Sequence, residues 1–144
     1  MRSLLLAILA FTMFGTGSEL VLLEHTESRT QLVPLVLLGI GLVAVAVVAV
    51  RPHRATLHAF RAVMAAFILA GAAGLYYHYR GNVEFELEMY PEMRGWKLVW
   101  EALSGATPAL APGAMMQMGL LGLACTFRHP LLQRMTPARE EIAA

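Results

Sequence analysis

The sequence predicts an all-α membrane protein: a four-transmembrane-helix bundle with a short amphipathic helix in its third loop. Apolar residues make up 58% of the 144 residues and charged residues only 15%, whereas soluble domains average near half apolar and a quarter charged. The apolar residues also gather in runs of the roughly 20 residues that a helix needs to cross a bilayer. We therefore treat residues 1–144 as a single integral membrane domain.

The first expected span covers residues 3–23 and contains one acidic residue, Glu19. Its basic start at Arg2, its apolar run and the small residues that follow also match a signal peptide, whose removal would leave three spans. Hydrophobicity resumes after Glu19, however, so the segment is long enough to span, and we favour a retained helix. The second expected span, residues 30–50, carries no charge and is the clearest in the chain.

The third and fourth expected spans cover residues 57–79 and 107–127. The third is uncharged beyond Arg61. The fourth begins with Thr107 as a natural N-cap and with Pro108 at the first helical position, where a missing N–H costs nothing. Residues 128–144 are expected to form a polar cytoplasmic tail.

The third loop, residues 80–106, is the longest segment outside the expected spans. Residues 83–90 alternate apolar and acidic side chains, which is the period of a strand with one wet face, although the chain offers it no evident partner strand. After Pro91 the apolar residues recur at helical spacing and predict a short amphipathic helix that lies flat in the outer interface. Trp96 and Trp100 would be its interfacial anchors.

The distribution of basic residues predicts that both termini are cytoplasmic. Lysine and arginine concentrate in the cytoplasmic loops of membrane proteins, whereas acidic residues have little influence. One side holds seven basic residues: Arg2, Arg51, Arg54, Arg61, Arg128, Arg134 and Arg139. The other side holds four: Arg29, Arg80, Arg94 and Lys97. We therefore expect a bacterial-type inner-membrane protein with an even number of spans.

Small residues recur every four positions along the third span, at Ala62, Ala66, Ala70 and Gly74. Such a stripe lets two helix backbones approach closely, which matters because lipid provides no hydrophobic drive between helices. We expect this stripe to pack inside the bundle, and a subunit interface is the alternative.

Two polar residues fall inside expected spans, Glu19 near the outer end of the first and Gln117 within the fourth. A carboxylate at the bilayer centre costs about 2.5 kcal/mol or more, and less near the interface, where the side chain reaches water. Glu19 is therefore either an interfacial residue or a protonatable or cation-coordinating group that faces the bundle interior. Gln117 is expected to hydrogen-bond across helices.

A group of candidate metal ligands is expected at the outer face of the bundle. Under the predicted topology it comprises Glu19, His25, His78, Glu84, Glu86 and Glu88. Carboxylate and imidazole are ligands that zinc, copper and iron accept, although no familiar ligand spacing such as HExxH occurs. The alternative is a wet, acidic rim with two interfacial histidines. No cofactor is indicated other than such a metal ion.

No catalytic residues stand out, so we expect a non-catalytic accessory subunit or a homo-oligomeric membrane scaffold. Its expected partners are membrane lipid and either copies of itself or partner membrane subunits. The alternatives are an ion, proton or metal binding or permeation protein that uses the outer Glu and His residues, and a membrane enzyme with acid–base chemistry at the same rim. A net charge of +1 gives no basis for nucleic-acid binding, and the single cysteine, Cys125, excludes an internal disulfide.

Overall fold

The computed structural model describes residues 1–105 and 107–133, and no strand occurs among them. The α-helices are α1 (Arg2–Leu22), α2 (Arg29–Val50), α3 (Arg54–Met89), α4 (Gly95–Ser104) and α5 (Gly113–Cys125), and a 3₁₀ helix, η1, covers Pro130–Leu132. The prediction of an all-helical chain is confirmed for these residues. Most of the expected cytoplasmic tail, from residue 134 onward, lies outside them.

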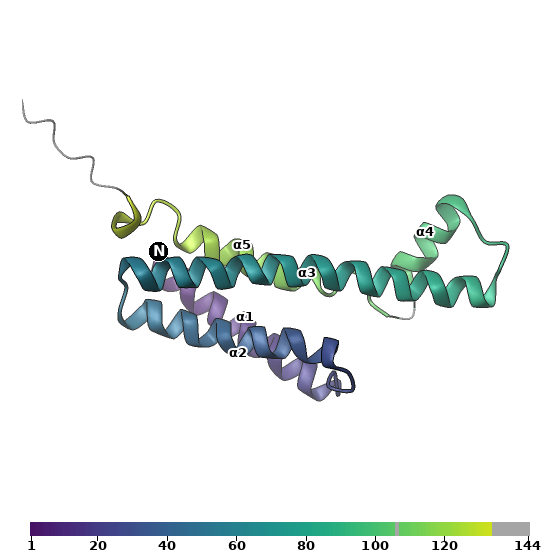
Figure 1. Cartoon of the computed structure of the whole chain (residues 1–144), viewed down its shortest axis with the longest axis horizontal. Coiled ribbons are helices and arrows are strands. Elements are labelled where there is room, and N and C mark those ends of the chain that lie inside the picture. Colours follow the sequence, from purple (N-terminus) through teal and green to yellow (C-terminus); the bar gives the residue numbers. More distant parts are fainter. Residues whose placement is uncertain (106, 134–144) are drawn as a thin grey trace, which may run out of the picture.

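Four of the helices close a ring around a shared core (Figure 1). α1 contacts α2, α2 contacts α3, α3 contacts α5, and α5 contacts α1. The guanidinium of Arg2 donates hydrogen bonds to the carbonyl oxygens of Phe127 (3.4 Å) and Arg128 (3.1 Å). One end of the bundle therefore holds the N-terminus, the α2–α3 turn and the end of α5, whereas the opposite end holds the α1–α2 turn.

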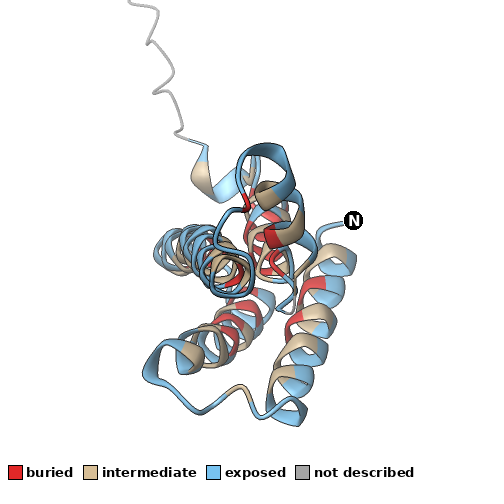
Figure 2. Ribbon diagram, turned by 90° about the vertical axis from the view of Figure 1, so that its right-hand side faces the viewer, coloured by how far each residue is buried: buried red, intermediate tan, exposed pale blue. Residues whose placement is uncertain are grey.

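The outside of this bundle is apolar. Figure 2 shows the buried residues facing one another between the helices and the exposed residues facing outward. The exposed residues include many large hydrophobic side chains, such as Phe11 (79% exposed) on α1 and Leu69 (72% exposed) on α3. α1, α2 and α3 are each long and apolar enough to cross a membrane. An apolar outer surface on such helices suits a bilayer, so the fold supports membrane association.

Glycines bring α3 and α5 into backbone contact. A Cβ atom added to Gly71 would lie 2.9 Å from the amide nitrogen of Met116, and one added to Gly119 would lie 2.6 Å from the carbonyl oxygen of Met64. Only glycine allows two helices to approach so closely. The fully buried side chains of Met64 and Phe67 fill the space toward the other helices.

The small-residue stripe expected along α3 faces the core only in part. Gly74 packs tightly, because an added Cβ would lie 2.7 Å from the Cβ of Pro112. Ala70 is half-buried and packs against the core, and Ala66 is also half-buried, but Ala62 is exposed. The Gly74 end of the stripe therefore packs inside the bundle, as we expected, while Ala62 does not.

α3 is much longer than the expected third span. Its 36 residues correspond to about 54 Å at ~1.5 Å per residue. The interpretation of residues 83–90 as a strand is wrong, because all but Tyr90 belong to the last turns of this helix. Glutamate favours helices, and α4 packs against this part of α3. We call Arg80–Met89 of α3 together with α4 the arm; Figure 1 shows it projecting beyond the α1–α2 turn.

The fourth bundle helix begins at Gly113, later than the Thr107 expected from the sequence. Pro112 explains the delay, because it has no N–H for the carbonyl of Pro108, four residues earlier, and its ring would clash with that carbonyl. Residues 108–112 instead form successive turns, in which the amide of Ala111 donates to the Pro108 carbonyl at 3.1 Å. α5 itself is therefore only 13 residues long.

Candidate functional site

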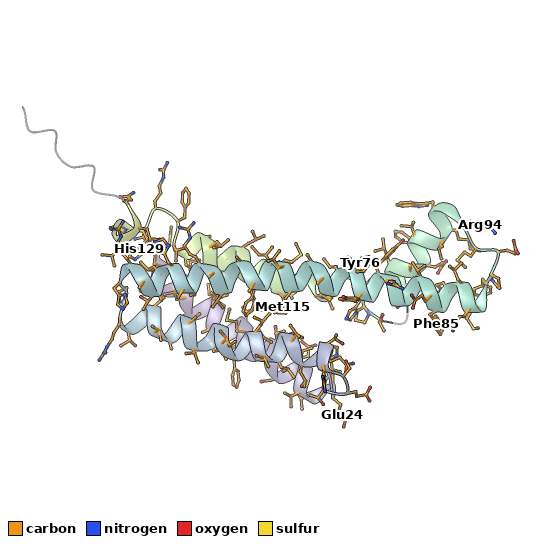
Figure 3. All side chains as sticks on the ribbon, in the orientation of Figure 1. Glu24, Tyr76, Phe85, Arg94, Met115 and His129 are labelled. Carbon is orange, nitrogen blue, oxygen red and sulfur yellow. The ribbon has the colours of Figure 1, made fainter. Side chains whose placement is uncertain are left out.

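A tight turn at the end of α1 places His25. The amide of Glu24 donates to the carbonyl of Val21 (3.0 Å), and that of His25 donates to the carbonyl of Leu20 (2.9 Å). These two bonds form a Schellman motif, which reverses the chain through one left-handed residue, usually glycine. Here the left-handed residue is Glu24, with φ 53°. Figure 3 shows Glu24 at this end of the α1–α2 hairpin.

His78 lies on α3 opposite this turn. Its side chain is half-buried, and no hydrogen bond joins it to His25 within the described part of the chain. Its Nδ1 atom is buried and has no hydrogen-bond partner among the described residues. The structure therefore does not join His25 and His78, the two histidines among the six residues expected to form a metal site, by a hydrogen bond among the described residues.

The expected acidic ligands lie apart from this pair. Glu19 is exposed on α1, and Glu84 and Glu88 are exposed on α3, whereas Glu86 is half-buried on another side of α3. Glu84 forms an ion pair with Arg80 at 2.9 Å. Within residues 1–105 and 107–133, no three His, Cys, Asp or Glu side chains gather into a group that could hold a metal ion.

The Arg80–Glu84 pair on the arm is exposed to solvent. The hydrogen bond from Arg80 to Glu84, and next the one to Tyr76, raise the pKa of the Arg80 guanidinium above its ordinary value. Because both side chains of the ion pair are more than half exposed, its contribution to stability is small. Glu84, one of the expected metal ligands, is therefore paired with an arginine on the surface and is not part of a binding site.

Asn82 fixes the arm to the bundle, and it is the key residue that we did not single out from the sequence. It is 2% exposed. Its side-chain NH₂ donates to the carbonyls of Ala102 (2.8 Å) and Thr107 (2.7 Å), while its Oδ1 accepts from the Thr107 hydroxyl (2.6 Å) and amide (3.2 Å). One side chain thus joins α3, α4 and the start of the segment that leads into α5.

A sequence signal for Asn82 does exist. It is the only asparagine of the chain, and an asparagine inside a helix is unfavourable unless its amide finds partners. Gly105 completes the fit, since an added Cβ there would lie 3.0 Å from the amide carbon of Asn82.

The remaining predicted polar and anchor residues are on the surface. Gln117 is exposed on α5, and no hydrogen bond joins its amide to another described residue, although we expected one across helices. Trp96 and Trp100 are 74% and 58% exposed on α4. All three side chains therefore face either lipid, water or another molecule.

No protein family, curated protein or solved structure matches this chain. The function is therefore argued from the geometry of the chain itself.

Proposed function

We propose that this chain is a four-pass inner-membrane protein with cytoplasmic termini, and that it serves as a non-catalytic structural or accessory subunit. In this proposal it assembles through the outer face of α5 with a second copy or with a partner membrane subunit. The observation that carries the proposal is the exposed, unpaired amide of Gln117.

A fourth membrane pass is supported by the distance that residues 108–127 cover along the bundle axis. Thr107 is hydrogen-bonded to Asn82, one turn beyond His78 on α3, and Arg128 lines a groove with Arg61. Residues 108–127 therefore run alongside α3 between the levels of His78 and Arg61. The 17 residues that separate the two levels on α3 rise about 26 Å at ~1.5 Å each, close to the ~30 Å of a hydrocarbon core. The non-helical turns before α5 are tolerable at membrane depth where protein covers them, and Ala109 there is 1% exposed.

Gln117 lies at the middle of this fourth pass. An amide that faces hydrocarbon without a partner costs several kcal/mol. Gly113 and Ala124 lie on the same side of α5, and small residues beside a polar one are typical of helix–helix interfaces in membranes. A neighbouring subunit on this face would give the amide its hydrogen bonds.

The distribution of basic residues supports an arm on the outer side of the membrane. Ala102 of α4 is bonded to Asn82, which lies one turn, about 6 Å, beyond His78. Trp100 is then at headgroup depth, which suits an amphipathic interfacial helix with Trp96 and Trp100 as its anchors. The arm would fix the height and rotation of the subunit in the membrane.

The test is the mass of the intact protein in mild detergent, for the wild type and for Gln117→Leu. We expect the wild type to form a complex larger than one 15.7 kDa chain. The substitution should weaken association about three- to thirtyfold, since an interhelical hydrogen bond is worth ~0.6–2 kcal/mol.

The matched control for this experiment is Thr12→Val. It removes a hydroxyl that bonds only to the carbonyl of Ile8 in its own helix, at 2.9 Å. The control should associate like the wild type. A monomeric wild type, or a Gln117→Leu variant that associates as strongly, contradicts the proposal.

A second candidate function, metal or proton binding at the outer face, is favoured by the buried Nδ1 of His78, which has no hydrogen-bond partner among the described residues. Elemental analysis of the purified wild type, His78→Ala and His58→Ala distinguishes it. Stoichiometric metal that is lost only in His78→Ala supports a metal site, since His58 is exposed near the opposite end of α3. Equal metal content in all three proteins rules that site out.

A further inference from the structure

A groove lies at the end of the bundle that holds both ends of the described chain, opposite the arm. It is open and has a volume of about 620 Å³, within the ~300–1,000 Å³ of typical ligand sites. Arg61 of α3 lines it together with Arg128 and His129, which follow α5, and Leu123 and Leu132 add apolar surface. Figure 3 shows His129 at this end, far from Glu24.

The surroundings of the groove are basic. Arg2, Arg51, Arg54 and His58 belong to the same end of the bundle, whereas all glutamates of the described residues lie near the opposite end or on the arm. An anion that approaches the groove therefore meets no carboxylate from the described part of the chain. One sign of charge concentrated around a groove attracts anions over some distance.

The turn after α5 holds the cations of the groove in place. Arg128 adopts a left-handed backbone conformation with φ 47°, and its guanidinium carbon lies 5.4 Å from the centre of the Phe127 ring. Arg2 bonds to the carbonyls of both residues. These bonds offset the negative end of the α5 dipole, which would otherwise repel an anion in the groove.

The histidine of the groove has a defined tautomer when it is neutral. Its Nδ1 accepts a hydrogen bond from the amide of Leu131 at 3.2 Å, so the ring proton is on Nε2 and His129 remains a donor. Two guanidinium groups and one imidazole N–H are the donors that proteins use for phosphate oxygens, because guanidinium matches their geometry with paired hydrogen bonds.

We infer that this groove binds the phosphate of an anionic phospholipid headgroup. Free phosphate shares this chemistry, but the apolar side of the groove favours a lipid. Leu123, Phe127 and Leu132 line it. Phe127 and the neighbouring Leu120 are 69% and 57% exposed on the apolar surface of the bundle, where an acyl chain would lie. Anionic lipids also enrich the cytoplasmic leaflet, the side to which the basic residues assign this end. The inference requires a membrane protein in this orientation, but not assembly through α5.

The experiment measures lipid retained by the intact chain in native mass spectrometry from a mild detergent. The probes are phosphatidylglycerol, phosphatidylcholine with the same acyl chains, and inorganic phosphate. We expect phosphatidylglycerol to bind at least tenfold more tightly than phosphatidylcholine. The variant Arg61→Gln/Arg128→Gln should bind it about thirtyfold more weakly, at ~1 kcal/mol for each arginine and ~1.4 kcal/mol for each factor of ten.

The matched control is Arg51→Gln/Arg54→Gln, which removes the same charge from the same end but outside the groove. It should keep nearly wild-type binding. Equal losses of binding in both double variants would mean that lipid binds through the general surface charge of this end, which contradicts a specific site. Unchanged binding in Arg61→Gln/Arg128→Gln would also overturn the site. Displacement of the lipid by inorganic phosphate at equal concentration would overturn the lipid assignment. Should the double variant fold poorly, Arg61→Gln alone should still bind about fivefold more weakly.

Discussion

The close contact between α3 and α5 predicts that Gly119→Ala destabilises the bundle. The added Cβ would lie 2.6 Å from the carbonyl oxygen of Met64 and 2.7 Å from Cγ1 of Ile68. The carbonyl belongs to the backbone of α3, so it cannot rotate away as a side chain would. Ordinary contact begins at 3.4 Å, and the two helices must therefore separate by about 0.8 Å at this point.

A gap of this size is costly across a packed interface. A separation of ~0.5–1 Å forfeits a quarter to a half of the dispersion energy of each contact, and overpacking of a core typically costs about 1–3 kcal/mol. The gain of at most about 1 kcal/mol in helix propensity from glycine to alanine offsets part of this. We expect a net loss of about 1–2 kcal/mol for Gly119→Ala.

Two other glycines serve as comparisons. A Cβ at Gly122 would overlap Sδ and Cγ of Met64, but this flexible side chain can move, so Gly122→Ala should cost less than Gly119→Ala. Gly39 has no atom within 4 Å of an added Cβ, so Gly39→Ala should leave the protein as stable as the wild type or slightly more stable. The expected order of stability is thus opposite to the one that the shortest distances alone would give for Gly119 and Gly122.

The assay is unfolding of each purified variant in mixed micelles with a rising fraction of sodium dodecyl sulfate, followed by circular dichroism. The expected order of midpoints is Gly39→Ala at or above the wild type, then Gly122→Ala, then Gly119→Ala. If Gly119→Ala unfolds together with Gly39→Ala, the backbones of α3 and α5 are not in contact and the reasoning fails.

Two further predictions concern the arm and the α1–α2 turn. Asn82→Ala leaves the carbonyls of Ala102 and Thr107 without their donors, which should destabilise the arm by about 3–5 kcal/mol. Hydrogen exchange should then show that the amides of α4 lose protection while those of α1 do not. Retained protection in α4 would contradict the role of Asn82. Glu24→Gly relieves a left-handed residue and should raise the unfolding midpoint by the equivalent of about 1 kcal/mol; a lower midpoint would mean that the Glu24 side chain is needed in the turn.

The sequence predicts the helices of the bundle well where a run of apolar residues meets a clear cap. Residues 30–50 were expected to be helical, and α2 spans Arg29–Val50. Its start is sharp because Ser28 and Gln31 form a capping box, with the amide of each bonded to the side chain of the other at 2.8 and 3.3 Å. Local chemistry decides such a boundary, so it can be read from the chain.

The arm could not be predicted in the same way, because its structure depends on contacts between distant residues. Residues 83–90 have the alternation of a strand, yet the backbone stays helical as far as Met89 where α4 covers one side of α3. The partners of Asn82 lie 20 and 25 residues further along the chain. Neither hydropathy nor local propensity contains that information.

The six candidate metal ligands also show that the sequence does not predict features that depend on tertiary packing. The sequence placed six candidate ligands at one end of the bundle, but their directions depend on how each helix is rotated and how each turn is closed. Glu24 takes up the left-handed position that closes the turn before His25, while Glu19 on α1 is exposed. The sequence indicates which helix each of these residues belongs to, but not the direction in which its side chain points.

Glu19 and Gln117 show how the structure separates two polar residues that looked alike in the sequence. Both are exposed on the bundle surface. Glu19 lies three residues before the end of α1 at Leu22, about 5 Å along the axis, so in the proposed arrangement its carboxylate would reach the headgroup layer without a protein partner. In the proposed four-pass arrangement, Gln117 is midway between Pro108 and Phe127, about 14 Å from either end if the segment rises at ~1.5 Å per residue, and its side chain would not reach water from there. The two side chains are equally long, so in the proposed arrangement it is the deeper position of Gln117 that gives it the greater need of a neighbouring subunit. For this reason the assembly experiment is designed around Gln117 rather than Glu19.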